Sequence, residues 1–277
     1  MQSDPLVVAG IAAALIVSTY MLMGLPMSES VLIGVPAGVA LVYRFDRTSD
    51  ASAEDSISHR TRRQWLQRHR GYVWGTTVLY VALGGWAFIH LSLAAQSATL
   101  AFVALGALYV WPLGGWRIKD IGAPKTLVVA LVWSAGVVGF PVLNHGLSSP
   151  AIDGGYASVL GLFAYRMGWL FPNLLCSDWA DREADRAAEL TTLAHGWSHG
   201  QVRGVAAGCA GIAALAAGAV AWSTGSAVWG AEAAASALLA VGVGMCPRHP
   251  GPTYRLALDL YMAVPGLIAV WAVWVTG

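Results

Sequence analysis

Charged residues are scarce in this chain. Asp, Glu, Lys and Arg together make up 11% of its 277 residues, whereas 57% are hydrophobic. An ordinary soluble domain is about a quarter charged. This deficit, together with long apolar stretches, excludes the usual soluble classes and predicts a protein that crosses a lipid bilayer several times. The formal net charge is only +1, so bulk charge gives no reason to expect a nucleic-acid partner.

Cysteine is rare as well. The three copies, Cys176, Cys209 and Cys246, lie singly inside or at the ends of apolar stretches. They lack the spacing of a zinc site, and no His–Glu–His pattern points to zinc either. We therefore interpret them as small apolar residues of the protein core.

Apolar stretches of membrane-spanning length are abundant. A spanning helix needs about 20 mostly apolar residues. Helices are expected, because a segment in lipid must satisfy its own backbone polar groups, and these runs are too long for barrel strands. The sequence thus predicts one all-α, polytopic membrane domain, residues 1–277, with nine transmembrane helices. The expected spans are 5–24, 28–45, 71–93, 96–114, 124–144, 156–177, 201–222, 226–246 and 254–276.

Basic residues occupy only alternate connections. The loops after spans two, four, six and eight, with the span ends beside them, hold every Lys and Arg except Arg166, which lies inside span six. By the positive-inside rule these four loops face the cytoplasm. We therefore expect a multi-pass protein of the cell membrane, plasma or inner, with a cytoplasmic N-terminus.

Two acidic clusters follow spans on this same side. Carboxylates packed together repel one another, so each must be protonated, paired or bound to metal. Sets of oxygen ligands suit Mg²⁺, which usually keeps some waters and shares substrate phosphates. Taken alone, either cluster can also be a solvated loop paired with its own arginines. The first cluster is Asp46, Asp50, Glu54 and Asp55, and the second is Asp178, Asp181 and Asp185.

Helical spacing places most of these carboxylates on two faces. The second cluster is spaced i, i+3, i+7, and Asp46, Asp50 and Glu54 are spaced i, i+4, i+8. Asp55 points away from Asp46 on a regular helix, so Glu54 is the preferred ligand, although a helix break near Ser52 reverses that order. The pattern predicts a magnesium site on the cytoplasmic side, and metal at a membrane surface points to a lipid diphosphate substrate.

These motifs resemble those of the UbiA superfamily of intramembrane prenyltransferases. Its first motif, Asn-Asp-x-x-Asp-x-x-x-Asp, falls on Asp46, Arg47, Asp50 and Glu54, so that Arg47 stands where a ligand is expected. Its second, Asp-x-x-Asp-x-x-x-Asp-Arg-x-x-Gly, falls on Asp178 to Arg186, with Glu189 in place of Gly. The number of spans and the basic loop after span four also match.

The resemblance implies a fold, a reaction and further site residues. Nine helices are expected around a central cavity, with Mg²⁺ bridging the diphosphate of an allylic prenyl donor. Basic side chains are expected to bind this diphosphate, namely Lys119, Lys125, Arg117, Arg60 and Arg47. For the arginines of segment 60–70, topology and anionic lipid headgroups are an alternative explanation.

Three residues near or inside spans are candidates for the substrate pocket. Tyr43 lies three residues before Asp46 and so shares its face, and Tyr165 lies within span six. Arg166 is a charge deep in a span, where charges are costly and usually face the bundle interior. It contacts either the substrate or one of two intramembrane acids, Glu232 and Asp259.

The leading hypothesis is a Mg²⁺-dependent prenyltransferase of the UbiA type, working in the bilayer. It joins a polyprenyl group from a prenyl diphosphate to an aromatic or other lipophilic acceptor. One alternative is a terpene cyclase on the same scaffold, which needs no acceptor. A remoter alternative is a transporter or lipid-binding protein, although no inverted repeat is evident.

Overall fold

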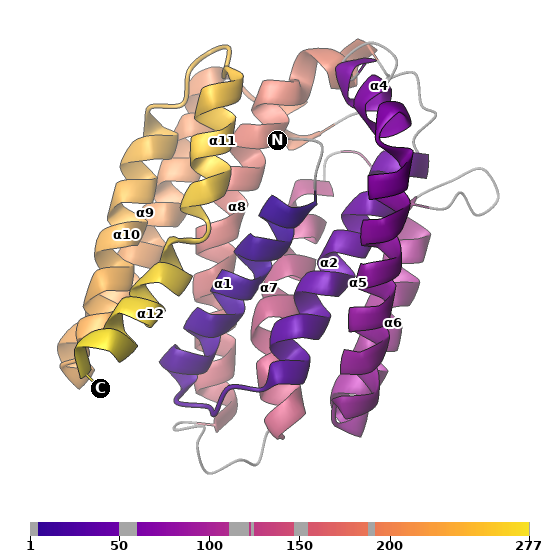
Figure 1. Cartoon of the computed structure of the whole chain (residues 1–277). Coiled ribbons are helices and arrows are strands. Elements are labelled where there is room, and N and C mark those ends of the chain that lie inside the picture. The colour runs from indigo at the N-terminus through magenta and orange to yellow at the C-terminus, as the bar shows by residue number, and fades with distance from the viewer. Residues whose placement is uncertain are drawn as a thin grey trace.

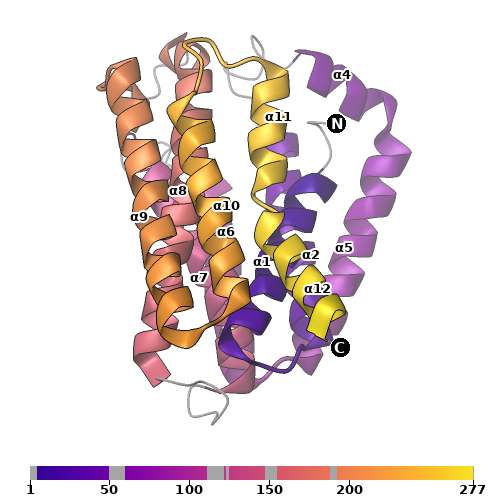
Figure 2. The ribbon, with the colours of Figure 1, turned by 90° about the vertical axis from the view of Figure 1, so that its left-hand side faces the viewer.

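The structure of the chain is a computed structural model, which describes residues 5–49, 60–110, 122, 125–146, 155–187 and 192–276. Within these ranges the regular structure is helical, so the all-α prediction is confirmed. The long helices run side by side along the length of the molecule (Figure 1), and a view turned by 90° shows the same bundle (Figure 2).

Six helices make up the first half of the described chain. They are α1 (Leu6–Met23), α2 (Glu29–Ser49), α4 (Arg60–Arg68), α5 (Arg70–His90), α6 (Leu93–Val110) and α7 (Lys125–His145). The second half consists of α8 (Gly155–Ala187), the short 3₁₀ helix η2 (Leu193–His195), α9 (His199–Thr224), α10 (Ala227–Gly244), α11 (Pro252–Tyr261) and α12 (Val264–Thr276).

Local signals explain several helix ends. Gly24 ends α1 and Gly225 ends α9 in the left-handed conformation, with φ of 62° and 66°, which glycine adopts without steric cost. Ser198 begins α9 with a capping box, in which its side chain and that of Gln201 each bind the other's backbone N–H. Ser226 accepts from the backbone N–H of Trp229 and so caps α10. The sequence therefore specifies the short α9–α10 hairpin locally.

Within the described residues, seven segments are long and apolar enough to cross a membrane: α1, α5, α7, α8, α9, α10 and the α11–α12 segment. The two other expected spans correspond to α2 and α6. The last turns of α2 carry Arg44, Asp46 and Arg47, and the described side chains of α6 form an apolar run over Leu93–Leu108. The chain is therefore a multi-pass membrane protein, and the number nine stays a prediction.

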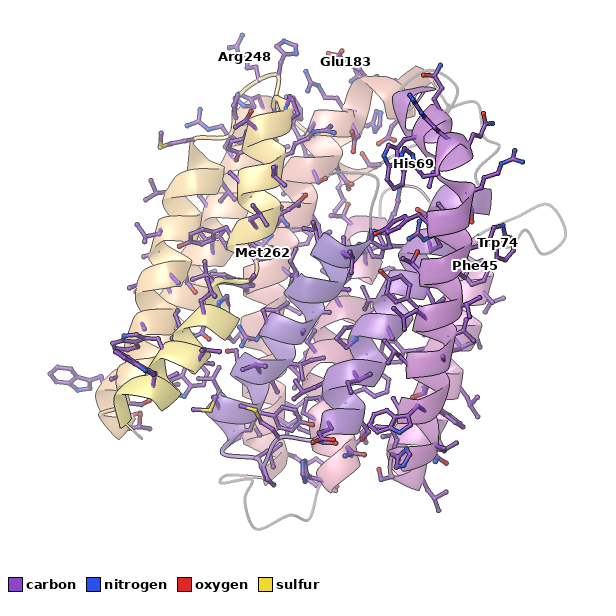
Figure 3. All side chains as sticks on the ribbon, in the orientation of Figure 1. Phe45, His69, Trp74, Glu183, Arg248 and Met262 are labelled. Carbon is purple, nitrogen blue, oxygen red and sulfur yellow. The ribbon has the colours of Figure 1, made fainter. Side chains whose placement is uncertain are left out.

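The ninth expected span is a pair of helices and not one continuous helix. At the join, the N–H groups of Met262 and Ala263 bond to carbonyls three residues earlier, at 3.0 and 3.1 Å, which tightens the last turn of α11. Pro265 follows; it has no N–H and disfavours a helical conformation in the residue before it. Figure 3 labels Met262 at this bend, where α12 turns away from α11.

Helix α8 extends further than the expected span 156–177. It continues to Ala187, so all three aspartates of the second cluster lie on its last turns. The expectation that this cluster continues its span as a helix is correct. Between α2 and α5, the helix α4 occupies part of the segment that is expected to be a basic loop.

Small residues allow the helices to pack closely in the absence of water. A Cβ on Gly168 of α8 would lie 3.0 Å from the Cβ of Ala213 and 3.3 Å from the carbonyl oxygen of Cys209, both on α9. Gly266 of α12 approaches α1 even more closely, since a Cβ there would lie 2.5 Å from the Cα of Ala14. Such contacts are typical of helix pairs in lipid. They fix α8 against α9 and α12 against α1.

Candidate functional site at the charged end

The acidic turns of α8 lie at one end of the bundle, which we call the charged end. Figure 3 labels Glu183, from these turns, and Arg248, from the connection between α10 and α11, at this end. Helix α7 begins beside Asp178, because the hydroxyl of Thr126 in its first turn donates a short hydrogen bond to the Asp178 carboxylate. Lys125, a predicted diphosphate ligand, is the preceding residue. The structure thus places a predicted metal ligand and a predicted anion-binding residue at one helix contact.

Asp181 lies against a different helix. Its Oδ1 atom accepts from Nη2 of Arg255 in α11, and the two side chains are 42% and 25% exposed. In the sequence, Arg255 is one of the basic residues at the loops and span ends that indicate topology. One face of α8 therefore contacts two helices. Asp178 contacts α7, and Asp181 contacts α11. Asp185, the third predicted ligand of the cluster, is buried with 3% of its surface exposed.

A second polar contact joins α11 to α8 deeper in the bundle. Asn173 Nδ2 donates to Asp259 Oδ1 at 3.4 Å. Asp259 follows Arg255 by four residues, so both lie on one face of α11. The intramembrane acid Asp259 is thus bonded to an amide of α8, and not to Arg166.

The connection between α10 and α11 is fastened over the same turns of α8. Nε1 of Trp179 and Nη1 of Arg182 both donate to the carbonyl oxygen of Arg248, each at 3.1 Å. The Arg182 guanidinium also lies over the Trp179 ring, 3.9 Å from its centre. In addition, Nδ1 of His249 lies 3.7 Å from a Glu183 carboxylate oxygen. These contacts hold the start of α11 in place at the charged end.

Two buried thiols lie next to this connection. Cys176 precedes Asp178 by two residues and Cys246 follows α10, and neither forms a disulfide. The Sγ atom of Cys246 donates to the carbonyl oxygen of Pro247 at 3.7 Å. The interpretation as core residues agrees with their burial, whereas Cys209 is only half-buried.

The first acidic cluster lies only partly within the described residues. Tyr43 packs edge-on against Trp133 of α7, with ring centres 6.3 Å apart. Arg44 is buried and donates to Thr76 of α5 at 3.0 Å. Asp46 lies one turn beyond Tyr43 on α2. Since α7 packs against both α2 and α8, Asp46 and Asp178 lie on two helices that share α7 as a neighbour.

The remaining predicted ligands fall outside the described part of the chain. This applies to Asp50, Glu54, Asp55, Arg117 and Lys119, and to the side chains of Arg47 and Arg60.

The described oxygen atoms can bind Mg²⁺ together with ligands from the substrate. Among the described residues, no three His, Cys, Asp or Glu side chains come together as a metal-binding group. Mg²⁺, however, is usually held by one or two carboxylates, with waters and substrate phosphates as the other ligands. Asp178, fixed by the Thr126 hydroxyl, offers such a carboxylate. The residues fit Mg²⁺ when the substrate itself supplies part of the coordination.

Tyr165 and Arg166 lie in a separate, sealed network. Arg166 Nη2 donates to Ser18 of α1 at 2.6 Å and lies 3.6 Å from a Glu232 oxygen of α10. The Ser18 and Tyr165 hydroxyls donate to the two Glu232 oxygens at 2.6 and 2.8 Å, and Ser236 lies 3.1 Å from the Tyr165 hydroxyl. Of the two partners expected for Arg166, Glu232 is the one observed. Twelve residues separate Arg166 from Asp178, about 18 Å along a helix.

Comparison with solved structures identifies the architecture. The chain superposes on a UbiA homolog from Aeropyrum pernix K1 over 95% of its own length and 97% of that chain, with a TM-score of 0.70 and 14% sequence identity. The fold is that of UbiA proteins. It also matches a digeranylgeranylglyceryl phosphate synthase over 96% of this chain and 92% of that one, with a TM-score of 0.58 and 12% identity. No protein-family model and no curated protein matches the sequence.

The UbiA-type fold confirms the architecture that the acidic motifs led us to expect. At this level of identity the likeness concerns the fold, and the chemistry has to be argued from the side chains.

Proposed function

We propose that the protein is a Mg²⁺-dependent prenyltransferase that transfers a polyprenyl group from a prenyl diphosphate to an aromatic or other lipophilic acceptor. The observation that carries the proposal is the position of Asp178 and Asp181 at one end of a UbiA fold, each held by a neighbouring helix. A bundle of apolar helices with charge at one end suits a substrate with a hydrocarbon tail and a charged head.

The reaction sets clear demands on the charged end. When the allylic C–O bond breaks, its electron pair leaves with the diphosphate oxygen, and an allyl cation remains. The acceptor then donates an electron pair to this cation and loses a proton. Magnesium, when bound, supplies positive charge to the departing diphosphate. Fixed charges placed where negative charge develops favour this step most.

The chain's own residues have distinct tasks in this proposal. Asp178 and Asp181, with the carboxylates of the first acidic cluster, hold the metal. Thr126 orients Asp178 through its hydrogen bond. Lys125, the neighbour of Thr126, contributes a cation for the diphosphate. The apolar helices below exclude water, which would otherwise capture the allyl cation.

The proposal also includes the side of the membrane at which the diphosphate binds and the kind of acceptor. The positive-inside rule places the charged end in the cytoplasm, where the prenyl diphosphate headgroup has access. The tail then lies among the helices, within the thickness of the bilayer. One solved structure with this fold is by name a synthase of a glyceryl phosphate lipid, which supports a lipophilic acceptor here.

The experiment is to incubate the purified protein with Mg²⁺, labelled geranylgeranyl diphosphate and a set of lipophilic acceptors. We expect diphosphate release and a prenylated product, and loss of both in Asp178→Ala. A hydrocarbon formed from the donor alone would instead identify a terpene cyclase. No Mg²⁺-dependent diphosphate release under any condition would refute the proposal and favour a transporter or lipid-binding protein.

A further inference from the structure

Arg255 joins the acidic turns of α8 from a helix that is distant in sequence. Its guanidinium donates to Asp181, and one turn later Asp259 accepts from Asn173. Both contacts come from one face of α11, so this face lies against α8. The ion pair with Asp181 places a positive charge directly at a predicted metal ligand.

The position of Arg255 does not depend on a single flexible side chain. The carbonyl of Arg248 just before α11 accepts two hydrogen bonds from α8, donated by Trp179 and Arg182. Below Arg255, the hydroxyl of Tyr261 donates to the carbonyl of Ala235 in α10 at 3.0 Å. The helix that carries Arg255 is thus tied to its neighbours at both ends, and the guanidinium is held at the charged end.

The guanidinium keeps unused donor capacity. Arginine has five N–H donors, and the Nε of Arg255 is buried without a hydrogen-bond partner among the described residues. The side chain is nevertheless 25% exposed and that of Asp181 42% exposed, so a ligand can reach the pair. A ligand with several anionic oxygens would satisfy these donors better than one carboxylate does.

We infer that Arg255 binds the diphosphate of the prenyl donor. The inference rests on the proposed function and adds a basic residue from α11 to Lys125 from α7. The planar guanidinium fork matches phosphate oxygens in a bidentate way. In the absence of donor, Asp181 neutralises Arg255. When the diphosphate takes over this role, the carboxylate of Asp181 becomes available as a metal ligand.

The test compares Arg255→Gln with a matched control, Arg248→Gln, because Arg248 is an exposed arginine of the same end that uses its backbone carbonyl in the contacts described. The probe is geranylgeranyl S-thiolodiphosphate, whose bridging sulfur slows ionisation. It is titrated calorimetrically into the purified protein with Mg²⁺.

We expect Arg255→Gln to weaken binding about tenfold or more, as for the loss of a hydrogen bond to a charged group. Arg248→Gln should bind like the unchanged protein. Equal affinity of Arg255→Gln and the unchanged protein overturns the inference.

Geranylgeraniol, which has the same tail and no diphosphate, separates binding from a structural role. Arg255→Gln should bind this alcohol as the unchanged protein does, and Arg255→Lys should recover part of the affinity for the thiolodiphosphate. An equal loss of affinity for alcohol and thiolodiphosphate would mean that Arg255 only positions α11, and the inference fails. If the unchanged protein binds the thiolodiphosphate no more tightly than the alcohol, the proposed function itself fails.

Discussion

Two of the ion pairs of helix α8 differ in how far their side chains are exposed. Arg166 and Glu232 are both fully buried, with 0% of either side chain exposed, and they share the hydroxyl of Ser18 from α1, while the Tyr165 hydroxyl of α8 also donates to Glu232. Asp181 and Arg255 are 42% and 25% exposed. The first pair is closed to ligands, whereas the second is open to them.

The two ion pairs of this one helix are expected to have different roles, one in stability and one in function. Charges inside a membrane are expensive, and they persist when paired and hydrogen-bonded. The buried pair joins α8 to α1 and α10 and so fixes the middle of the bundle. The open pair lies where a charged ligand can compete for either partner. The sealed network is therefore expected to control folding, and the charged end to control chemistry.

The largest expected effect comes from breaking the buried pair. Arg166→Leu leaves Glu232 uncompensated in a fully buried position. Removing one partner of a buried pair typically costs about 3–5 kcal/mol. We expect a large drop in the thermal unfolding temperature of the detergent-solubilised protein.

The double variant Arg166→Leu/Glu232→Leu is the control, because replacing both partners by apolar residues of similar size is often nearly neutral. Most of the lost stability should return. If Arg166→Leu is as stable as the unchanged protein but abolishes diphosphate release, Arg166 belongs to the substrate site, and the contrast between the two regions is wrong.

A second prediction concerns Asp178 at the open region. Asp178→Asn preserves the shape of the side chain but removes the charge that would hold a metal. We expect Mg²⁺-dependent diphosphate release to fall about a hundredfold, the scale for loss of one electrostatic group in an active site. The unfolding temperature should change little. Retained activity together with a lower unfolding temperature would assign Asp178 to folding.

The sequence predicted much of this arrangement because helical spacing depends on neighbours along the chain. The i, i+3, i+7 pattern of Asp178, Asp181 and Asp185 was enough to place them on one face, and α8 does extend through them. Charge deep in span six likewise led to Glu232 as one of two possible partners for Arg166. Both inferences required only one helix and the cost of burying charge.

What could not be predicted depends on how distant helices meet. Asp178 and Asp181 lie close together on one face, yet one contacts Thr126 of α7 and the other Arg255 of α11. No local pattern distinguishes Arg255 from the other basic residues that mark topology. The prediction of one continuous ninth span is wrong for a similar reason. Pro265 and Gly266 are typical of a helix break, but the long apolar run that contains them favours a single helix.

A third prediction tests the close packing around the sealed network. The Cβ added in Gly266→Ala would lie 2.5 Å from Ala14 on α1, so the helices must separate. Ala14 lies one turn from Ser18, whose hydroxyl contacts both members of the buried pair. Overpacking of this kind costs about 1–3 kcal/mol.

Gly10→Ala on α1 is the matched control, because nothing lies within 4 Å of its added Cβ. Thermal unfolding should show a clear loss for Gly266→Ala and none for Gly10→Ala. Equal unfolding temperatures for the two variants would show that α12 does not need this close approach.

The smallest predicted effect concerns Thr126, which acts on the open region only through Asp178. Thr126→Val keeps the shape of the side chain but removes the hydroxyl that donates to the carboxylate. Groups that orient a metal ligand are worth about 10–100-fold in metal affinity, and we expect the lower end, about tenfold. The measurement is the Mg²⁺ concentration needed for half-maximal diphosphate release.

The control is Thr99→Val, since among the described residues the Thr99 hydroxyl bonds only a carbonyl of its own helix, Ala95, at 2.8 Å. An unchanged Mg²⁺ requirement in Thr126→Val would mean that Asp178 reaches the metal without help from α7, or does not bind it, and the Asp178→Asn variant distinguishes these two cases.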